Sequence, residues 1–321
     1  MSDKIYALQQ HEYISVISKS QLEVTDYFSF GSETQLYDMV IYAENRAIIL
    51  CHKDSDAIML DVDLAEVTSD EIFRLTVGEY QKDSIVIAVS LDEETVVLNT
   101  HHMIYAVDRI SKSLIYQSPE EIAYERYFHT PERFENATLP VLIAMDITDG
   151  NPAKSLFLDL NTGIINEQET YNAIIFNRIG LSQDKGRLYA IGINGLNNDS
   201  IILSMNPNNG SEQRVTETEA PLQMRATGWQ WTDIGLITGI EAGAEVLIVS
   251  HDGPILEMIN TAIISPHAFY DGRALFTVGA DFYAPDKIRI NKYSDATNIN
   301  NVVSEYLDRP EDGSIIIKLV G

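Results

Sequence analysis

The chain has 321 residues, 45 % of them hydrophobic, and its 48 Asp and Glu residues outnumber its 22 Lys and Arg residues. The formal net charge of −26 repels phosphate backbones, which excludes nucleic acid from the expected partners. No apolar run approaches the roughly 18 residues of a membrane-spanning helix, and we expect no signal peptide. Because Cys51 is the single cysteine, no intrachain disulfide can form, and we expect a cytoplasmic monomer.

Seven hairpin-like segments follow one another along the chain. In the clearest copy two strands flank the turn Asn161-Thr162-Gly163, where Asn and Gly tolerate the positive φ of a tight reversal. Successive turns lie about 42 to 52 residues apart, close to the ~40–50-residue period of propeller blades. In chain order the segments are Ile14–Phe28, Ile58–Asp70, Ile104–Ser118, Leu156–Gln168, Ile202–Val215, Val246–Met258 and Lys287–Val303.

A further pair of short strands precedes the later hairpins. Tyr37–Ala43 and Ala47–His52 form such a pair in the second unit, and Ile263–Tyr270 and Ala274–Gly279 form one in the seventh. Four short antiparallel strands make one propeller blade. The sequence therefore predicts an all-β fold, a seven-bladed β-propeller in a single domain over residues 1–321, with six blades as the alternative.

The first unit is one strand short. Lys4–Gln9, Tyr13–Ser18 and Leu22–Phe28 supply three strands, and no sequence remains before them for a fourth. The apolar segment Ser314–Val320 at the other end of the chain is the candidate for the missing strand. We expect it to pair with Lys4–Gln9 and close the ring, with addition to the outside of the last blade as the alternative.

Residues 117–138 depart from the repeat. Ser118-Pro119-Glu120-Glu121 resembles a helix start, with Ser as the N-cap, Pro at the first position and Glu at the third. We expect a short helical insertion here, before strand character resumes at Leu139–Met145. A plain elongation of the connection is the alternative.

The seven units resemble the β-propeller superfamily, and the strand–DxxTG–strand pattern at Asp159–Gly163 is similar to YVTN-type and quinoprotein-type blades. The resemblance covers nearly the whole chain. The units are WD40-like in architecture only, because the Trp-Asp and Gly-His pairs of true WD repeats are absent. The resemblance implies the fold, whereas propellers include enzymes, ligand binders and docking platforms.

Several polar segments are predicted to share one rim of such a propeller, because each joins the second to the third strand of its blade. Their carboxylate and amide oxygens suit a hard divalent cation such as Ca²⁺, the single cofactor that the sequence suggests. His52, His101 and Asp146 are the candidate metal ligands, against the alternative of ordinary solvated loops. The segments are His52–Asp56, His101–His102, Asp146–Lys154, Asn194–Asp199 and Asp281–Asp286.

The leading functional hypothesis is a non-enzymatic protein-interaction or ligand-binding scaffold whose acidic rim binds a basic protein or peptide. Trp229 and Trp231 share a strand face and, with His101 and His102, are the candidate ligand-binding residues; packing between blades is the alternative for the tryptophans. No G-x-S-x-G turn or phosphate-binding glycine loop is present. The alternative function is a metal-assisted hydrolase of lactonase type, with its site at the mouth of the central channel.

Overall fold

The computed structural model describes residues 3–9, 12–76, 86–100, 103–118, 128–135, 137–143, 154–169, 174–182, 186–194, 199–220, 226–240, 243–295, 302–308 and 316–321. Within these ranges 29 strands form seven sheets, and no helix is assigned. The fold is therefore all-β, a seven-bladed β-propeller, as the repeat spacing predicts. None of the described residues forms a helix that could cross a membrane.

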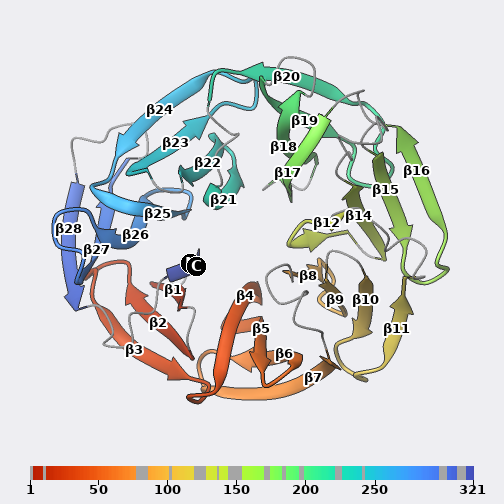
Figure 1. The fold of residues 1–321 in the computed structure, drawn as a ribbon, viewed down its shortest axis with the longest axis horizontal. Helices are drawn as coiled ribbons and strands as arrows, with labels where there is room; N and C mark the ends of the chain where they lie inside the picture. The colour runs from red at the N-terminus through yellow and green to blue at the C-terminus, as the bar shows by residue number, and fades with distance from the viewer. Residues whose placement is uncertain are drawn as a thin grey trace. The chain divides into compact units, whose positions relative to one another are not determined.

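The chain packs as two compact units, which are described separately: residues 1–39 with 224–321, and residues 40–223. That the whole chain forms one domain stays a prediction. Three sheets belong to the first unit (Figure 1), with strands in the order in which they pair. Blade 1 contains β29 (Ile316–Val320), β1 (Lys4–Gln9), β2 (Tyr13–Ser18) and β3 (Val24–Ser29); blade 6 contains β21 (Ala226–Thr232), β22 (Gly235–Ile240), β23 (Glu245–Val249) and β24 (Ile255–Asn260); blade 7 contains β25 (Ile263–Tyr270), β26 (Leu275–Asp281), β27 (Lys287–Tyr293) and β28 (Val302–Asp308).

The second unit holds the other four sheets, apart from the first residues of β4. Blade 2 contains β4 (Thr34–Ala43), β5 (Arg46–Lys53), β6 (Asp56–Asp63) and β7 (Thr68–Thr76); blade 3 contains β8 (Val86–Ser90), β9 (Thr95–Asn99), β10 (Ile104–Asp108) and β11 (Leu114–Gln117), with β13 (Arg133–Phe134) added beside β8; blade 4 contains β12 (Phe128–His129), β14 (Thr138–Ile143), β15 (Lys154–Asp159) and β16 (Ile165–Glu169); blade 5 contains β17 (Ile174–Leu181), β18 (Leu188–Asn194), β19 (Ser200–Met205) and β20 (Arg214–Thr218).

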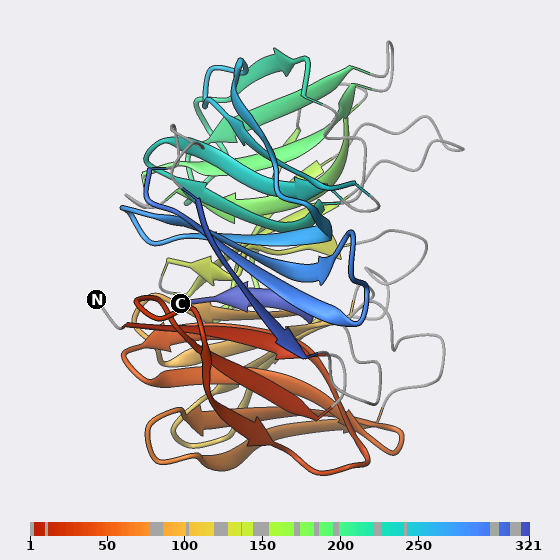
Figure 2. The same ribbon diagram turned by 90° about the vertical axis from the view of Figure 1, so that its left-hand side faces the viewer.

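The last strand of the chain completes the first blade. β29 pairs with β1 in antiparallel register, with Val320 opposite Tyr6 and Lys318 opposite Leu8. In Figure 2 the blue β29 lies beside the red β1. Leu319 joins a buried apolar cluster shared with blade 7, and the Lys318 ammonium lies 2.6 Å from the carboxylate of Asp38. The prediction that the C-terminal strand completes the N-terminal blade is confirmed.

The turns between the outer two strands repeat from blade to blade. Asp63, Asp108 and Asp159 each begin such a turn, and one carboxylate oxygen accepts hydrogen bonds from the backbone N–H groups two and three residues later. Four residues after each aspartate the backbone is left-handed, at Val67 (φ 55°), Lys112 (φ 60°) and Gly163 (φ 71°). Only glycine adopts this conformation without strain, so Gly163 suits its place and Val67 does not.

Val67→Gly should stabilise the protein. A side chain at positive φ costs about 1–2 kcal/mol, and the exposed Val67 side chain gives up little packing when it is removed. Glycine loses roughly 0.5–1 kcal/mol more backbone entropy on folding, so we expect a net gain of about 1 kcal/mol in urea unfolding. Ala65→Gly, in the same turn but outside the left-handed region, is the matched control and should destabilise.

Blade 3 gains an unexpected strand from the segment between blades 3 and 4. β13 runs parallel to β8, its Phe134 is fully buried, and Arg133 donates to the carbonyls of Tyr42 and Ser90. Burial lowers the pKa of the Arg133 guanidinium. The predicted helical insertion falls largely on residues 119–127, which lie outside the described residues. The described part of the segment is held to the blades through Arg133 and Phe134.

A buried histidine lies where the closing strand meets blade 7. The side chain of His267, on β25, is almost fully enclosed. Its imidazole forms a hydrogen bond with the backbone of Ile316 in β29. Desolvation lowers the pKa of His267 from 6.5 to about 4, against the weaker opposing effect of that hydrogen bond. The imidazole is therefore neutral in the folded protein at neutral pH.

Acid should weaken the fold through His267. The pKa is lower in the folded than in the unfolded chain, so the unfolded state takes up the proton first as pH falls from 6.5 towards 4. The free energy of unfolding should lose about 3 kcal/mol across this window, at ~1.4 kcal/mol per pKa unit. Urea unfolding of the wild type and of His267→Gln between pH 7 and pH 4 measures the effect. If the free energy of unfolding fell equally with pH in both proteins, His267 would contribute nothing to the loss of stability in acid.

Candidate functional site

Of the predicted metal ligands, the structure describes only His52. It lies within β5 rather than in a loop, it is buried, and its strand partner is Ala57. His101, His102 and Asp146 lie outside the described residues. In the part of the chain that is described, no three His, Cys, Asp or Glu side chains gather closely enough to hold a metal ion. The metal site stays a prediction.

The two tryptophans lie in β21, the first strand of blade 6. Trp231 is 5 % exposed, and its ring stacks on that of His251 with a centroid distance of 6.4 Å and an interplanar angle of 19°. The side chain of Trp229 lies outside the described residues. An open aromatic surface at Trp231 would require this stacked pair to separate, and a ligand-binding role for the tryptophans stays a prediction.

The loop between β26 and β27 belongs to the predicted rim segment Asp281–Asp286, which the structure describes along its whole length. Its first carboxylate, that of Asp281, is buried and accepts hydrogen bonds from the backbone N–H groups of Tyr283 (2.8 Å) and Ala284 (2.7 Å). The second oxygen of Asp281 lies 2.5 Å from the Nε of Arg289. The Phe282 N–H also donates to the carbonyl of Ala262, at 2.9 Å. Asp281 therefore fixes the loop rather than facing solvent as a ligand.

Two aromatic side chains project from this fixed loop. Phe282 is 56 % exposed and Tyr283 is 79 % exposed. Their ring centroids are 5.3 Å apart at an interplanar angle of 77°, an edge-to-face pair. Exposed aromatic rings held in one conformation lose little entropy on binding, which is why Tyr and Phe suit interaction surfaces. We name Phe282 and Tyr283 the aromatic rim pair.

The brace under the aromatic rim pair extends to the outer strand of blade 7. Arg289, paired with Asp281, also lies over the ring of Tyr306 with its guanidinium carbon 4.9 Å from the centroid, and it donates to the Tyr306 hydroxyl. Tyr306 lies on β28. One charged side chain therefore links the loop to the edge of the sheet, so the loop is anchored from both directions.

Carboxylates occur in the loop of the aromatic rim pair and in a neighbouring loop of the same unit. Asp286 is exposed at the end of the same loop, and Glu245 is half-buried at the start of β23, where it accepts a hydrogen bond from the N–H of Ala244. Backbone hydrogen bonds at 2.8–2.9 Å join the loop before β23 to the connection between blades 6 and 7. The site thus combines aromatic rings with carboxylates on connected loops of one unit.

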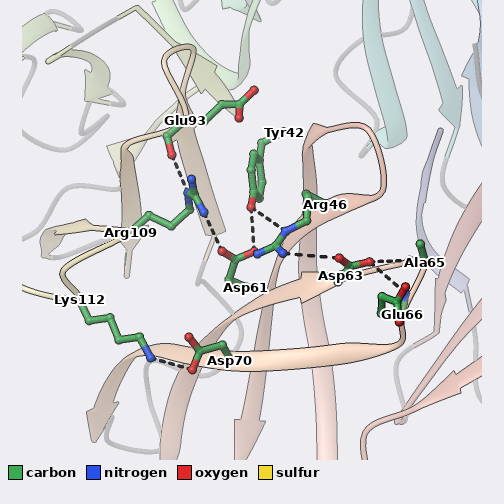
Figure 3. Close-up of polar contacts among 10 residues, drawn as sticks. All are labelled: Tyr42, Arg46, Asp61, Asp63, Ala65, Glu66, Asp70, Glu93, Arg109 and Lys112. Carbon is green, nitrogen blue, oxygen red and sulfur yellow. Dashed lines mark hydrogen bonds and ion pairs between the residues drawn. The ribbon is translucent and has the colours of Figure 1, made fainter.

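A second polar cluster, between blades 2 and 3, is structural (Figure 3). The buried carboxylate of Asp61 lies 2.7 Å from Arg46 and 2.9 Å from Arg109, and the Tyr42 hydroxyl donates to it at 2.8 Å. Burial, aided by the hydrogen bond to Asp61, raises the pKa of Tyr42. Arg109 also donates to the carbonyl of Glu93, at 2.6 Å. Because these groups satisfy one another, the cluster joins two sheets and leaves no reactive group poised for chemistry.

Sequence reasoning did not find the Asp61 cluster or the exposure of the aromatic rim pair. Asp61 and Arg109 are separated by 48 positions, about one repeat, so an alignment of successive units could have suggested their contact. The aromatic pair lies in the predicted rim segment Asp281–Asp286, which the sequence selects for its carboxylates. The sequence does not indicate that the two rings are exposed, because an aromatic residue next to a strand is usually buried.

No family model and no curated protein matches the sequence. Among solved structures, a protein from Lactobacillus plantarum is 12 % identical with a TM-score of 0.68, covering 100 % of this chain and 99 % of that chain. Hsv2 from Kluyveromyces lactis is 10 % identical with a TM-score of 0.60, over 96 % of this chain and 95 % of that chain. A prolyl endopeptidase is 8 % identical with a TM-score of 0.62, over 94 % of this chain but only 47 % of its own length. These similarities concern the fold, which enzymes and other proteins share.

Proposed function

We propose that the protein is a non-enzymatic, cytoplasmic interaction scaffold whose acidic rim loops bind a basic protein or peptide. The observation that supports this most is the aromatic rim pair, two exposed rings on a braced loop. Interfaces concentrate their binding energy in a few aromatic and arginine side chains. A ring face attracts a Lys or Arg cation by about 0.5–2 kcal/mol, so Phe282 and Tyr283 suit a partner rich in arginine.

The charge of the chain supports the same partner. A formal charge of −26 attracts a basic segment over long range and raises its rate of association. Asp286 supplies an exposed carboxylate in the loop that carries the rings. Attraction of this kind weakens with salt, because the Debye length falls from about 10 Å at 0.1 M to about 3 Å at 1 M.

The test uses a fluorescein-labelled decapeptide of alternating arginine and glycine, with binding followed by fluorescence anisotropy at two salt concentrations. We expect the double variant Phe282→Ser/Tyr283→Ser to weaken binding at least tenfold, about 1.4 kcal/mol. Tyr27→Ser, which removes an exposed tyrosine from β3, is the matched control and should bind like the wild type. Equal affinities of the wild type and the double variant would refute the proposed site.

The hydrolase alternative is separated from the scaffold by metal content. A metal bound in stoichiometric amount to the purified protein, and lost from both His101→Ala and Asp146→Ala, would support the enzyme. Mass spectrometry of the native protein and elemental analysis measure this directly. Binding of the arginine–glycine peptide that weakens with increasing salt, and that persists in protein treated with a chelator, would support the scaffold.

A further inference from the structure

A shallow apolar cleft opens between blades 3 and 4. It lies at β11 and β16, and Figure 1 shows these two strands at the outer edges of their sheets. Its enclosed space of about 10 Å³ holds no more than one water molecule, so most of the surface it offers is around its mouth. The hydroxyl of Ser118, one of the lining residues, already accepts a hydrogen bond from the N–H of Ile104. The cleft is lined by Ile104, Tyr116, Ser118, Val141, Leu156, Leu158 and Ile165.

Large exposed aliphatic side chains lie next in sequence to Tyr116 and Ile165, two of the residues that line the cleft. Leu114 (48 %) and Ile115 (37 %) are exposed on β11, Ile165 (37 %) is the first residue of β16, and Ile164 (59 %) precedes it in the turn. The turn before β16 meets β11 here, because a Cβ placed on Gly163 would lie 3.5 Å from the ring of Tyr116. Extended apolar patches are rare on monomeric proteins and mark interaction sites. We name Leu114, Ile115, Ile164 and Ile165 the edge patch.

The charges around the edge patch indicate which kind of partner it would bind. Glu167 lies two residues after Ile165 and therefore on the same face of β16. Asp108 and Asp159 begin the two turns that lead into β11 and β16. A second copy of this chain would bring another formal charge of −26 against these carboxylates, which opposes self-association. A segment with lysine or arginine beside its apolar side chains suits the patch better.

We propose that the edge patch binds a short segment of a partner protein in which aliphatic side chains alternate with lysine or arginine. The apolar side chains lie over the cleft and the cations face Glu167 of β16, while the carboxylates of Asp108 and Asp159, which accept backbone N–H groups in their turns, add to the negative field. The Arg-Gly peptide that probes the aromatic rim pair has no aliphatic side chain, so the two surfaces are tested by different ligands. This inference does not rest on the proposed function of the rim loops.

A fluorescent label on Ile165→Cys reports on the patch. The native thiol, Cys51, is buried, and burial raises its pKa to about 12, so a thiol reagent should modify the introduced cysteine selectively. The probe is a decapeptide of alternating leucine and lysine. We expect a blue shift of a polarity-sensitive dye on Ile165→Cys and none on Leu256→Cys, an exposed leucine on β24. Equal shifts at both positions would overturn the proposal.

Binding by unlabelled variants provides the quantitative test. Leu114→Gln/Ile164→Gln should weaken binding of the leucine–lysine peptide at least tenfold, whereas Leu256→Gln should leave it unchanged. A decapeptide of alternating leucine and glutamate should not bind. A wild-type dimer in sedimentation that dissociates in the double variant would overturn the proposal in favour of a second copy. Binding of zwitterionic lipid vesicles in preference to the peptide would overturn it in favour of a membrane.

Discussion

Deletion of residues 314–321 should lower the melting temperature by at least about 10 °C. The deletion removes β29, with Leu319 and Ile316 from the apolar cluster that blades 1 and 7 share. Each buried aliphatic side chain contributes about 1.5–3 kcal/mol. Removal of Lys318 also leaves the carboxylate of Asp38, 9 % exposed, without its cation. β1 becomes an unprotected sheet edge, which favours aggregation.

A peptide with the sequence of residues 314–321 provides the control for this deletion. Added in excess to the truncated protein, it should restore part of the lost melting temperature by occupying the place of β29 beside β1. A scrambled peptide of the same composition should not. A truncated protein that melts at the temperature of the full chain would show that β29 adds little to the fold.

Asp61→Ala should cost about 3–5 kcal/mol of unfolding free energy. The substitution leaves the half-buried guanidinium of Arg109 and the buried hydroxyl of Tyr42 without the carboxylate that binds both. Loss of the charged partner of a largely enclosed group is strongly destabilising. Arg46 is more exposed and can turn towards Asp63 or water. Urea unfolding measures the change, because blades 2 and 3 are expected to unfold in the same transition.

Asp70→Ala is the matched control for Asp61→Ala. Asp70 pairs with Lys112 at 2.7 Å between the same two blades, but its side chain is 66 % exposed. Exposed ion pairs contribute roughly 0–1 kcal/mol, so Asp70→Ala should change stability by less than about 1 kcal/mol. A similar loss of unfolding free energy in both variants would mean that burial is not the reason why the Asp61 cluster stabilises the protein.

The sequence predicts the parts of this fold that depend on local chemistry. The turn at Asp159–Gly163 is visible because an aspartate and a glycine occupy positions that a tight reversal requires. The closing strand is visible because Ser314–Val320 is apolar and the first unit lacks a strand. In both cases a single short segment predicts the structural element, and the spacing of the repeats predicts where that element lies in the fold.

The missed features depend on contacts between units. Val67 shows that a blade keeps its turn when the favoured glycine is replaced by a residue that the conformation penalises. β13 has only two residues, and its parallel pairing with β8 is fixed by the burial of Phe134 rather than by a local pattern. Asp281 appears in the sequence as a rim carboxylate, but the structure uses it to hold the loop. A carboxylate next to a turn satisfies backbone N–H groups before it is available to a ligand.

The edge patch and the aromatic rim pair share one physical cause. Each outer strand or loop has one side on which apolar side chains add little to the core, and exposed apolar side chains that gather there mark interaction sites. Leu114 and Tyr283 are large and exposed, on elements that are otherwise well anchored. This contrast is the reason we propose a binding role for both, and the two peptide probes separate their contributions.

Hydrogen exchange of the unmodified protein tests most directly the claim on which the account depends, that the chain's last strand completes its first blade. We predict that the amides of residues 316–320 that face β1 exchange as slowly as those of β2, because this backbone pairs with β1 from Tyr6 to Gln9. Complete exchange of those amides within seconds at neutral pH, while β2 stays protected, would contradict the account.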